Sequence, residues 1–208
     1  MKKVLLGLLA LSAVSFAAQG NIFLNARVGM DLGAKYDDIS YFNETVLSDK
    51  TDEFGGEIAL EGYKNLTDNF DLGLGLAYQM HADRDAQYVQ NFNTEVSGLE
   101  YDSIPVYLIA KYNVDTDSEF KPYLKANLGY SFNFNPSNVK DKNFGIDSES
   151  EVKDGIYWAL GGGVAYNNFT VDLMYAVTTA KSEVKDFDTE EDNNYGRIVF
   201  SAGYRFNL

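Results

Sequence analysis

The 208-residue sequence contains no cysteine, a single histidine and only three prolines. Without cysteine the chain cannot form disulfide bonds or thiolate metal sites, and we expect no lipid anchor attached through a cysteine. Beyond its first residues, no segment approaches the 18 consecutive apolar residues that indicate a membrane-spanning helix. These absences exclude a disulfide framework, a cysteine-based metal centre and a helical membrane protein.

Positive charge is also scarce, because 17 lysines and arginines stand against 31 acidic residues, for a formal net charge of −14. A chain this acidic is repelled by the phosphates of nucleic acids, so we expect no nucleic-acid partner. The residues that are abundant are tyrosine (15), phenylalanine (14) and glycine (18). An abundance of aromatic residues and glycine is expected for closely packed strands with aromatic side chains at a membrane interface.

The amino-terminal segment has the residue order of a secretory signal. Lys2 and Lys3 form a positive start, and Val4–Val14 is an apolar stretch too short to span a bilayer. Ser15 and Ala17 place small residues at the −3 and −1 positions of a cleavage site. An amphipathic amino-terminal helix of a soluble protein is the alternative.

We therefore predict a cleaved signal peptide at residues 1–17 and one mature domain at residues 18–208. Removing the two lysines of the signal changes the formal charge from −14 to −16. The mature chain is long enough for one domain with a sizeable core.

Apolar residues alternate with small or polar residues in eight segments of the chain. In the last segment one face carries Ile198, Phe200, Ala202, Tyr204, Phe206 and Leu208. The other face carries Val199, Ser201, Gly203, Arg205 and Asn207. The earlier segments are Ile22–Gly33, about Phe54–Tyr63, Phe70–His81, Ser103–Tyr112, Tyr123–Phe132, Ile156–Tyr166 and Phe169–Thr178. A period of two indicates strands, and each segment reaches the roughly 9–11 residues that a tilted membrane strand needs.

The connections between these segments alternate in length. The short ones are Asn65–Asn69, Asn113–Glu119 and Asn167–Asn168. The long ones are about Ala34–Glu53, Ala82–Asp102, Asn135–Gly155 and Ala180–Tyr195. Eight strands joined in this way predict an all-β fold, an eight-stranded antiparallel transmembrane β-barrel with up-and-down topology. The hairpins recur about every 50 residues, and the competing solenoid would need a consensus in each unit that the sequence lacks.

Periodicity alone does not say which face points inward. A soluble, lipocalin-like barrel would place the apolar face inside and the polar face in water. The polar face carries many glycines, among them Gly73, Gly75, Gly129 and Gly161, and small residues suit a narrow lumen. The other face carries large aromatics including Trp158, which suit lipid. The residue sizes favour the membrane barrel.

With its eight alternating segments, unequal connections and aromatic terminal strand, the chain resembles small outer-membrane barrels of the OmpA, OmpX and opacity-protein type. The resemblance covers about Ile22 to Leu208. It implies a location in the cell outer membrane of a diderm bacterium, with short turns in the periplasm and long loops outside the cell. It implies that the barrel-assembly machinery reads the last strand, although the family usually ends in Phe and this chain ends in Leu208. The implied partners are outer-membrane lipids, lipopolysaccharide and a possible surface ligand at the long loops, and we expect a monomer.

The predicted lumen faces carry ten charged residues of balanced sign. The positive ones are Arg27, Lys111, Lys125, Arg197 and Arg205, and the negative ones are Asp31, Glu57, Glu61, Asp71 and Asp172. Isolated buried charges are costly, so these side chains must pair. We predict one pair between Asp71 and Lys111 near the periplasmic end and another between Asp31 and Arg197 near the outer end. The sequence leaves open a plugged lumen and a narrow ion path through the same residues.

His81 is the only histidine and therefore the only obvious general base. Lipid A deacylases and palmitoyltransferases are small barrels with a catalytic histidine near a serine, and the alternative is a structural histidine at the rim. The deacylase pattern places that serine two residues later, where this chain has Asp83. We predict no enzyme, and no catalytic, cofactor-binding or metal site. An acidic tract in the fourth long loop (Asp186, Asp188, Glu190, Glu191 and Asp192) is either solvated or gathers divalent cations.

The sequence thus predicts a non-enzymatic integral outer-membrane barrel with a plugged polar lumen. Its expected role is to stabilise the outer membrane and to present acidic surface loops for adhesion or partner binding. The alternative is a small porin that passes ions or small solutes. No binding motif in the loops names a ligand.

Overall fold

A computed structural model describes residues 22–41, 44–51, 54–91, 93–185 and 189–207. The predicted signal peptide and Leu208 lie outside these residues. Eight long strands form a closed barrel: β1 (Ile22–Tyr36), β4 (Gly56–Asn65), β5 (Phe70–Met80), β8 (Asp102–Asn113), β9 (Phe120–Phe134), β13 (Gly155–Tyr166), β14 (Phe169–Thr178) and β17 (Tyr195–Asn207). Within the described residues, no helix has the length and apolarity to cross a membrane.

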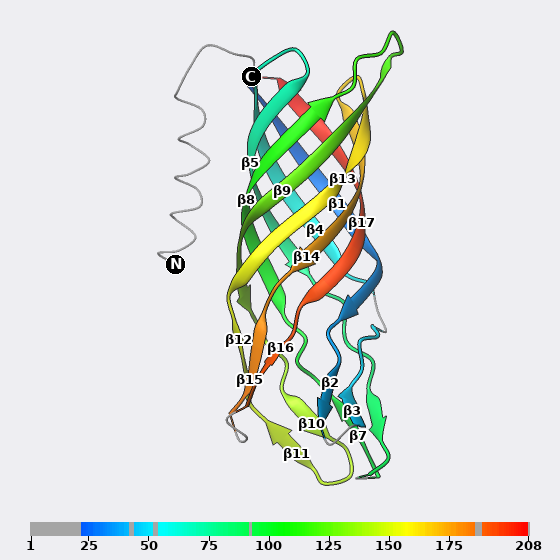
Figure 1. The fold of residues 1–208 in the computed structure, drawn as a ribbon, viewed down its shortest axis with the longest axis vertical. Coiled ribbons are helices and arrows are strands. Elements are labelled where there is room, and N and C mark those ends of the chain that lie inside the picture. The colour runs from blue at the N-terminus through cyan, green and yellow to red at the C-terminus, as the bar shows by residue number, and fades with distance from the viewer. Residues whose placement is uncertain (1–21, 42–43, 52–53, 92, 186–188, 208) are drawn as a thin grey trace.

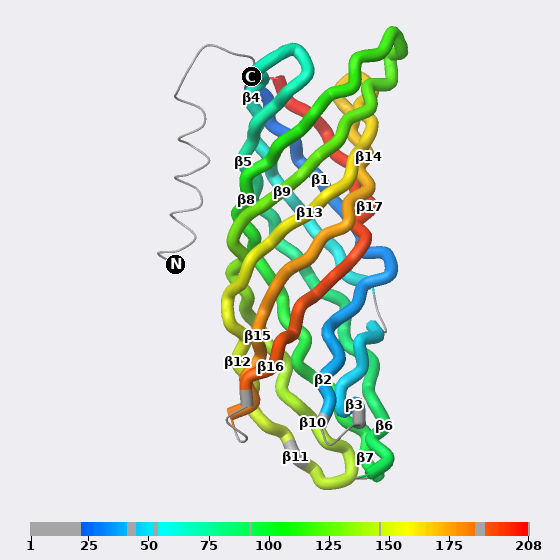
Figure 2. The backbone as a smooth tube through the Cα atoms, viewed as in Figure 1, coloured from blue at the N-terminus to red at the C-terminus, as the bar shows by residue number. Residues whose placement is uncertain are grey.

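The barrel has the predicted up-and-down topology, and each strand pairs antiparallel with its neighbour (Figure 1). β1 and β17 close the wall over a long register that runs from Phe23 opposite Asn207 to Leu32 opposite Ile198. The tube in Figure 2 shows all strands tilted against the long axis, as barrel closure requires. The short connections and the carboxy terminus share one end, here called the turn end, and the long connections share the other, the loop end.

Side chains alternate between the two faces of the wall along every barrel strand. Outward-facing Leu108, Leu128 and Leu160 are 57%, 61% and 61% exposed. Inward-facing Glu61 and Arg197 are 0% and 1% exposed. A soluble barrel would bury the leucines and expose the charges, so the structure excludes the lipocalin-like alternative and confirms the membrane barrel.

Several strand ends, those of β1 and β4 among them, differ by a few residues from the sequence prediction. β1 continues past Gly33 to Tyr36, and its pairing with β17 is irregular between Leu32 and Lys35. Gly33 adopts a left-handed conformation (φ +59°), which glycine allows at little cost and which accommodates a bulge. β4 begins at Gly56 rather than at Phe54.

The described parts of the four long connections contain nine further short strands, which the sequence did not predict. They are β2 (Ile39–Tyr41), β3 (Glu44–Leu47), β6 (Gln87–Val89), β7 (Thr94–Ser97), β10 (Val139–Asp141), β11 (Ile146–Ser148), β12 (Ser150–Lys153), β15 (Lys181–Val184) and β16 (Thr189–Asp192). They pair as a four-stranded sheet, a three-stranded sheet and a hairpin beyond the barrel. These nine strands and the segments between them are called the loop-end extension (Figure 2).

Candidate functional site

A network of buried charges occupies the middle of the lumen, and Arg27 on β1 lies at its centre. The Arg27 guanidinium contacts three carboxylates: Nη2 lies 2.7 Å from Glu57 Oε1, Nε lies 3.6 Å from Glu61 Oε1, and Nη1 lies 3.5 Å from Asp172 Oδ2. Arg27 and its three partners are almost fully buried. Glu57 and Glu61 come from β4 and Asp172 comes from β14, so Arg27 links strands on both sides of the seam between β1 and β17.

Glu61 is fully buried, and its carboxylate has several partners. Lys125 Nζ donates to both carboxylate oxygens at 2.8 Å. The hydroxyls of Tyr63 and Tyr107 donate to the same group at 2.6 and 3.0 Å. Asp172, 3.9 Å from Lys125, accepts from the Tyr123 hydroxyl at 2.9 Å. Multiple partners of this kind offset the desolvation of a buried carboxylate.

The network continues toward the loop end through Arg197 on β17. Its guanidinium lies 3.7 Å from Glu57 Oε2 and 3.3 Å from Asp31 Oδ1. The predicted pair of Asp31 and Arg197 is therefore confirmed. Asp31 also accepts a 2.9 Å hydrogen bond from the Tyr195 hydroxyl, which itself accepts from the Ala82 backbone N–H at 3.0 Å. These contacts connect the lumen to the start of the loop-end extension.

At the turn end, Asp71 on β5 faces Lys111 on β8, as predicted. Their Nζ and Oδ2 atoms are 3.7 Å apart, which is an ion pair without a hydrogen bond. Asp71 accepts instead from the side-chain amides of Asn65 and Asn113. The Lys111 ammonium lies 4.2 Å from the centre of the Tyr123 ring. Cation–π contact thus supplements a loose ion pair.

Aromatic rings fill the lumen between these charges. The Tyr107 ring lies directly over Gly75 on the neighbouring strand, and a Cβ atom at Gly75 would come within 2.2 Å of it. Tyr107 also packs against Tyr157 with ring centres 5.0 Å apart. Glycine on β5 therefore makes room for the tyrosine ring of the neighbouring strand β8 on the lumen face.

His81 lies one residue beyond β5, where the lumen meets the loop-end extension. Although Asp83 replaces the serine of the deacylase pattern, another serine lies beside the ring, since Ser103 Oγ is 3.1 Å from His81 Nε2. The serine comes from β8, so a search for nearby positions in sequence could not find it. Its hydroxyl also donates to Gln79 Oε1 at 2.8 Å, and the His81 ring stacks on Tyr195 at 4.0 Å. Ser103 is fully buried and His81 nearly so, which leaves a substrate no access to the pair.

Arg84 organises the loop-end extension. Its Nη1 donates to the backbone carbonyls of Asp37 and Ser48 at 2.9 and 2.7 Å, and Nη2 donates to Asn193 Oδ1 at 2.6 Å. The guanidinium also lies 4.5 Å from the centre of the Tyr36 ring. One buried side chain thereby joins three of the four long connections. No pattern in the sequence distinguishes Arg84 from an exposed loop arginine.

The loop-end extension also has an apolar core of its own. Its buried members are Ile39, Leu47, Val89, Val96 and Leu99. They come from the first and second long connections, and Val139 and Val184 from the third and fourth pack against them. Four connections that share one core form an ordered unit rather than separate loops.

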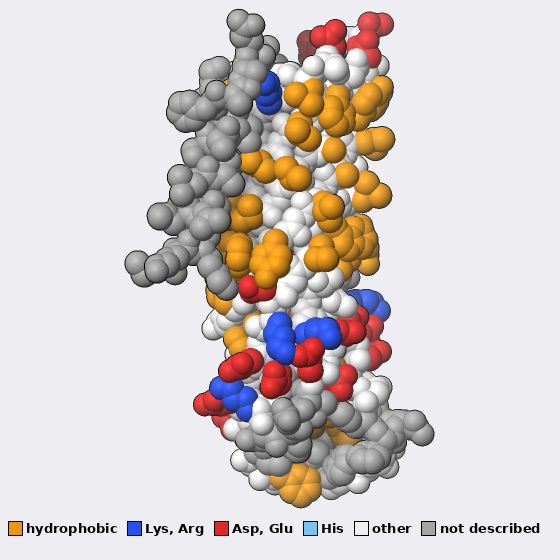
Figure 3. All heavy atoms as spheres, turned by 60° about the vertical axis from the view of Figure 1, so that its left-hand side comes forward, with side chains coloured by type: hydrophobic (Ala, Val, Ile, Leu, Met, Phe, Trp, Pro, Cys, Tyr) orange, Lys and Arg blue, Asp and Glu red, His pale blue; other side chains and the backbone are white. Residues whose placement is uncertain are grey.

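The outer wall carries a broad apolar band bounded by aromatic side chains. Figure 3 shows this band above a belt of acidic and basic residues. Toward the turn end, Phe120 stacks on Tyr166 at 4.8 Å. Toward the loop end, Trp158 packs edge-on against Tyr175 at 5.7 Å. Two aromatic girdles flanking an apolar band are typical of membrane barrels.

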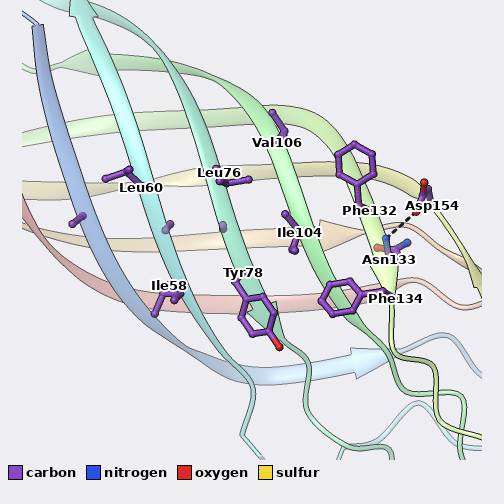
Figure 4. A pocket seen from close by; sticks show the side chains of 13 residues that line it. Ile58, Leu60, Leu76, Tyr78, Ile104, Val106, Phe132, Asn133, Phe134 and Asp154 are labelled. Atoms are coloured by element: carbon purple, nitrogen blue, oxygen red, sulfur yellow. Dashed lines mark hydrogen bonds between the residues drawn. The ribbon is translucent and has the colours of Figure 1, made fainter. Parts of the chain in front are cut away.

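A hollow of about 640 Å³ lies on this wall across β4, β5, β8 and β9 (Figure 4). Its lining is almost entirely apolar and includes Leu76, Tyr78, Ile104 and Phe132. The pairing of β5 with β8 is interrupted here between Leu76 and Gln79. Pro105 explains the interruption, because proline has no N–H to donate to the ladder. The hollow belongs to the lipid-facing surface.

In the described part of the chain, no group of three or more His, Asp or Glu side chains is arranged to hold a metal ion. Asp186 and Asp188 of the acidic tract lie outside the described residues. Glu190 and Asp192 are described, and each forms ion pairs with lysines of the neighbouring strand β15 or of β12. The possibility that this tract gathers cations gains no support from its described residues.

The sequence profile of the outer membrane protein beta-barrel domain matches residues 5–206. The chain belongs to this family. It is 28% identical to the Pasteurella multocida protein PM1543, over 99% of this chain and 98% of that protein. Its fold is similar to that of the outer membrane protein OprG from Pseudomonas aeruginosa, with a TM-score of 0.53 and 15% identity over 91% of this chain and 97% of OprG.

The fold is also similar to that of the outer membrane protein AlkL, with a TM-score of 0.52 and 13% identity over 91% of this chain and 92% of AlkL. At these identities the likeness concerns the fold alone. The family match and the exposed apolar wall confirm the resemblance drawn from the sequence. The protein is an integral β-barrel of the cell outer membrane.

Proposed function

We propose that this protein is a non-enzymatic barrel with a closed lumen, which stabilises the outer membrane and carries an ordered surface unit. The observation that carries the proposal is the Arg27 network. A guanidinium held by Glu57, Glu61 and Asp172 crosses the lumen at mid-height. An ion would have to separate these groups to pass, and separating buried ion pairs is costly.

Conductance in planar bilayers tests this proposal against the porin alternative. The wild-type protein should give no discrete current steps under conditions in which a known small porin, inserted as a control, gives them. A variant with Arg27→Ala and Glu57→Ala removes the shortest ion pair of this network and should conduct more than wild type. Stable, voltage-independent steps from the wild-type barrel would favour a small porin.

We further propose that the turn end faces the periplasm and the loop-end extension lies outside the cell, where it meets lipopolysaccharide and any surface ligand. Protease added to intact cells should cleave, if anywhere, in the loop-end extension. The turns at Asn65–Asn69 and Asn113–Glu119 should be cut only after the outer membrane is permeabilised. Cleavage confined to those turns in intact cells would reverse the orientation.

The barrel-assembly machinery is the proposed partner of β17. Phe206 faces lipid beside Tyr204, with ring centres 4.9 Å apart, and pairs with Leu24 on β1. Deleting Phe206–Leu208 should leave the protein unassembled in the periplasm. Replacing Phe206 with Tyr keeps an aromatic end and serves as the control. A truncated protein that reaches the outer membrane in normal amounts would exclude a role for these residues in assembly.

A further inference from the structure

The five cations on the lumen face differ in how fully they are paired with acids. Three of them contact at least two carboxylates each: Arg27, Lys125 and Arg197. The fourth, Lys111, lies 3.7 Å from Asp71 without a hydrogen bond. The fifth, Arg205, pairs with no carboxylate among the described residues, and its Nε is buried without a hydrogen-bond partner. Both incompletely paired cations lie at the turn end of the lumen.

Asp71 does not take up the donors of these cations, because other groups already occupy its carboxylate. The side-chain amide of Asn65 donates to Oδ1, and that of Asn113 donates to Oδ2 at 2.9 Å. Lys111 therefore neutralises the charge of Asp71 without being needed for its hydrogen bonds. The three N–H groups of the ammonium remain available to another acceptor.

Aromatic rings hold both cations in place. The Lys111 side chain is only 6% exposed, and its ammonium lies 4.2 Å from the centre of the Tyr123 ring and 5.5 Å from that of Tyr63. The Arg205 guanidinium lies 4.8 Å from the centre of the Phe23 ring. A ring face attracts a cation electrostatically but offers no oxygen to its donors. The rings thus position two cations whose hydrogen-bonding capacity is not used.

Both cations line a depression of about 340 Å³ at the turn end, here called the turn-end pocket. This volume is near the lower limit of small-molecule sites, which span about 300–1,000 Å³. Exposed carboxylates line its outer part: Asp68 lies between β4 and β5, and Asp115 and Glu119 lie between β8 and β9. The exposed Lys121 also lies there and donates to the Thr116 carbonyl. The pocket is therefore positive at its buried base and mainly negative at its rim.

We propose that the turn-end pocket binds the terminal carboxylate of a small zwitterion, either an amino acid or a short peptide. The planar guanidinium of Arg205 matches two carboxylate oxygens, and the ammonium of Lys111 supplies a further donor. The three rim carboxylates repel a ligand that is only anionic, whereas they attract the ammonium of a zwitterion. The inference rests on the orientation proposed above for its compartment, the periplasm. Because the Arg27 network closes the lumen further in, the ligand binds at the mouth and does not pass.

Isothermal titration calorimetry on the full-length protein, folded in detergent micelles, measures the binding. Trialanine is the probe, trialanine amide lacks the carboxylate, and N-acetyl-trialanine lacks the ammonium. Arg205→Gln should weaken trialanine binding about tenfold, as expected for the loss of a charged hydrogen-bonding group, and amidation of the peptide should weaken it at least as much. Arg205→Lys should keep part of the affinity. Lys35→Gln is the matched control, since Lys35 pairs with Asp49 at 2.7 Å at the loop end, and it should bind like wild type.

Equal affinities of wild type and Arg205→Gln would overturn the inference, as would equal affinities for trialanine and its amide or the absence of binding at millimolar peptide. Binding of N-acetyl-trialanine as tight as that of trialanine would contradict a site for zwitterions. Alanine, titrated in parallel, distinguishes the sources: an affinity equal to that of trialanine assigns the site to free amino acids, and a weaker one assigns it to peptides. These measurements do not depend on conductance or protease access, so their failure leaves the closed lumen and the orientation untouched.

Discussion

Two buried arginines show how differently the lumen and the loop-end extension are held together. Arg27 in the lumen contacts only side-chain carboxylates, those of Glu57, Glu61 and Asp172. Arg84 in the extension donates to two backbone carbonyls and one side-chain amide oxygen. In the lumen, a buried cation is paired with buried carboxylates, whereas in the extension one cation donates hydrogen bonds to backbone carbonyls.

The difference follows from the backbone of each region. In the barrel nearly every main-chain group pairs with a neighbouring strand, so only side chains remain as partners. In the extension the strands are only three or four residues long. Carbonyls between them lack ladder partners, and a guanidinium with five donors can serve several at once. Loss of either arginine should therefore damage its own region first.

The largest effect is expected in the lumen. Arg27→Ala leaves three buried carboxylates short of a partner and should lower the free energy of unfolding by about 3–5 kcal/mol. Urea unfolding in lipid vesicles measures the loss. Arg27→Met combined with Glu57→Leu should cost less than the sum of the two single changes, since it removes both members of the 2.7 Å ion pair. Additive losses would mean that these residues do not act as one network.

Arg84→Ala should have the next largest effect, and a local one. Loss of the charged donor should destabilise the extension by about 1.5–3 kcal/mol in all, while the barrel remains folded. Amide hydrogen exchange should rise in residues 37–51 and 82–101 but not in β8 or β9. Arg84→Lys is the control that keeps the charge but not the fork of donors, and we expect it to restore only part of the protection. Equal loss of protection throughout the barrel would contradict two separable regions.

A weaker coupling is expected at the turn end. Asp71 and Lys111 are 3.7 Å apart, and each has other partners. A double-mutant cycle with Asp71→Ala and Lys111→Ala should give a coupling of about 1 kcal/mol, well below that of Arg27 with Glu57. Urea unfolding in vesicles again provides the measurement. A coupling energy as large as that between Arg27 and Glu57 would show that the distance and hydrogen bonding of an ion pair do not determine how strongly its members are coupled.

An effect of similar, small size concerns pH at the junction of the two regions. Burial, aided by the positive charge of Arg197, holds the pKa of His81 well below its usual value. Below about pH 6.5 the unfolded chain binds a proton that the folded chain does not, so stability falls as the pH drops. His81 should contribute a loss of about 1.4 kcal/mol by pH 5.5. His81→Gln should show a shallower decline than wild type between pH 7.5 and 5.5, and equal slopes would remove His81 as the cause.

The sequence predicted the barrel well because a period of two is a direct consequence of strand geometry, and each strand carries it independently. The pair of Asp71 and Lys111 could also be predicted, since both residues lie at the turn end of two barrel strands that are adjacent in the wall. Glu61 and Lys125 lie on strands that are not neighbours, so only the curvature of the closed wall reveals their contact. Ser103 and Arg84 were missed for the same reason, as their partners come from other strands or connections. Short strands in the extension carry too few residues for alternation to show.

The most direct test of a closed lumen uses the absence of cysteine. Ser201 faces the lumen at mid-height and is 1% exposed. Its hydroxyl has no hydrogen-bond partner in the described structure, so the substitution Ser201→Cys should perturb the fold little. The measurement is the rate at which a small, charged, membrane-impermeant thiosulfonate labels this single thiol in the folded barrel. A separate variant, Ser40→Cys, places the thiol on the exposed surface of β2 and is the reactive control. The closed network predicts rapid labelling of the control and none of residue 201 until urea unfolds the protein. Comparable labelling of both positions in the folded barrel would contradict a closed lumen and support a conducting one.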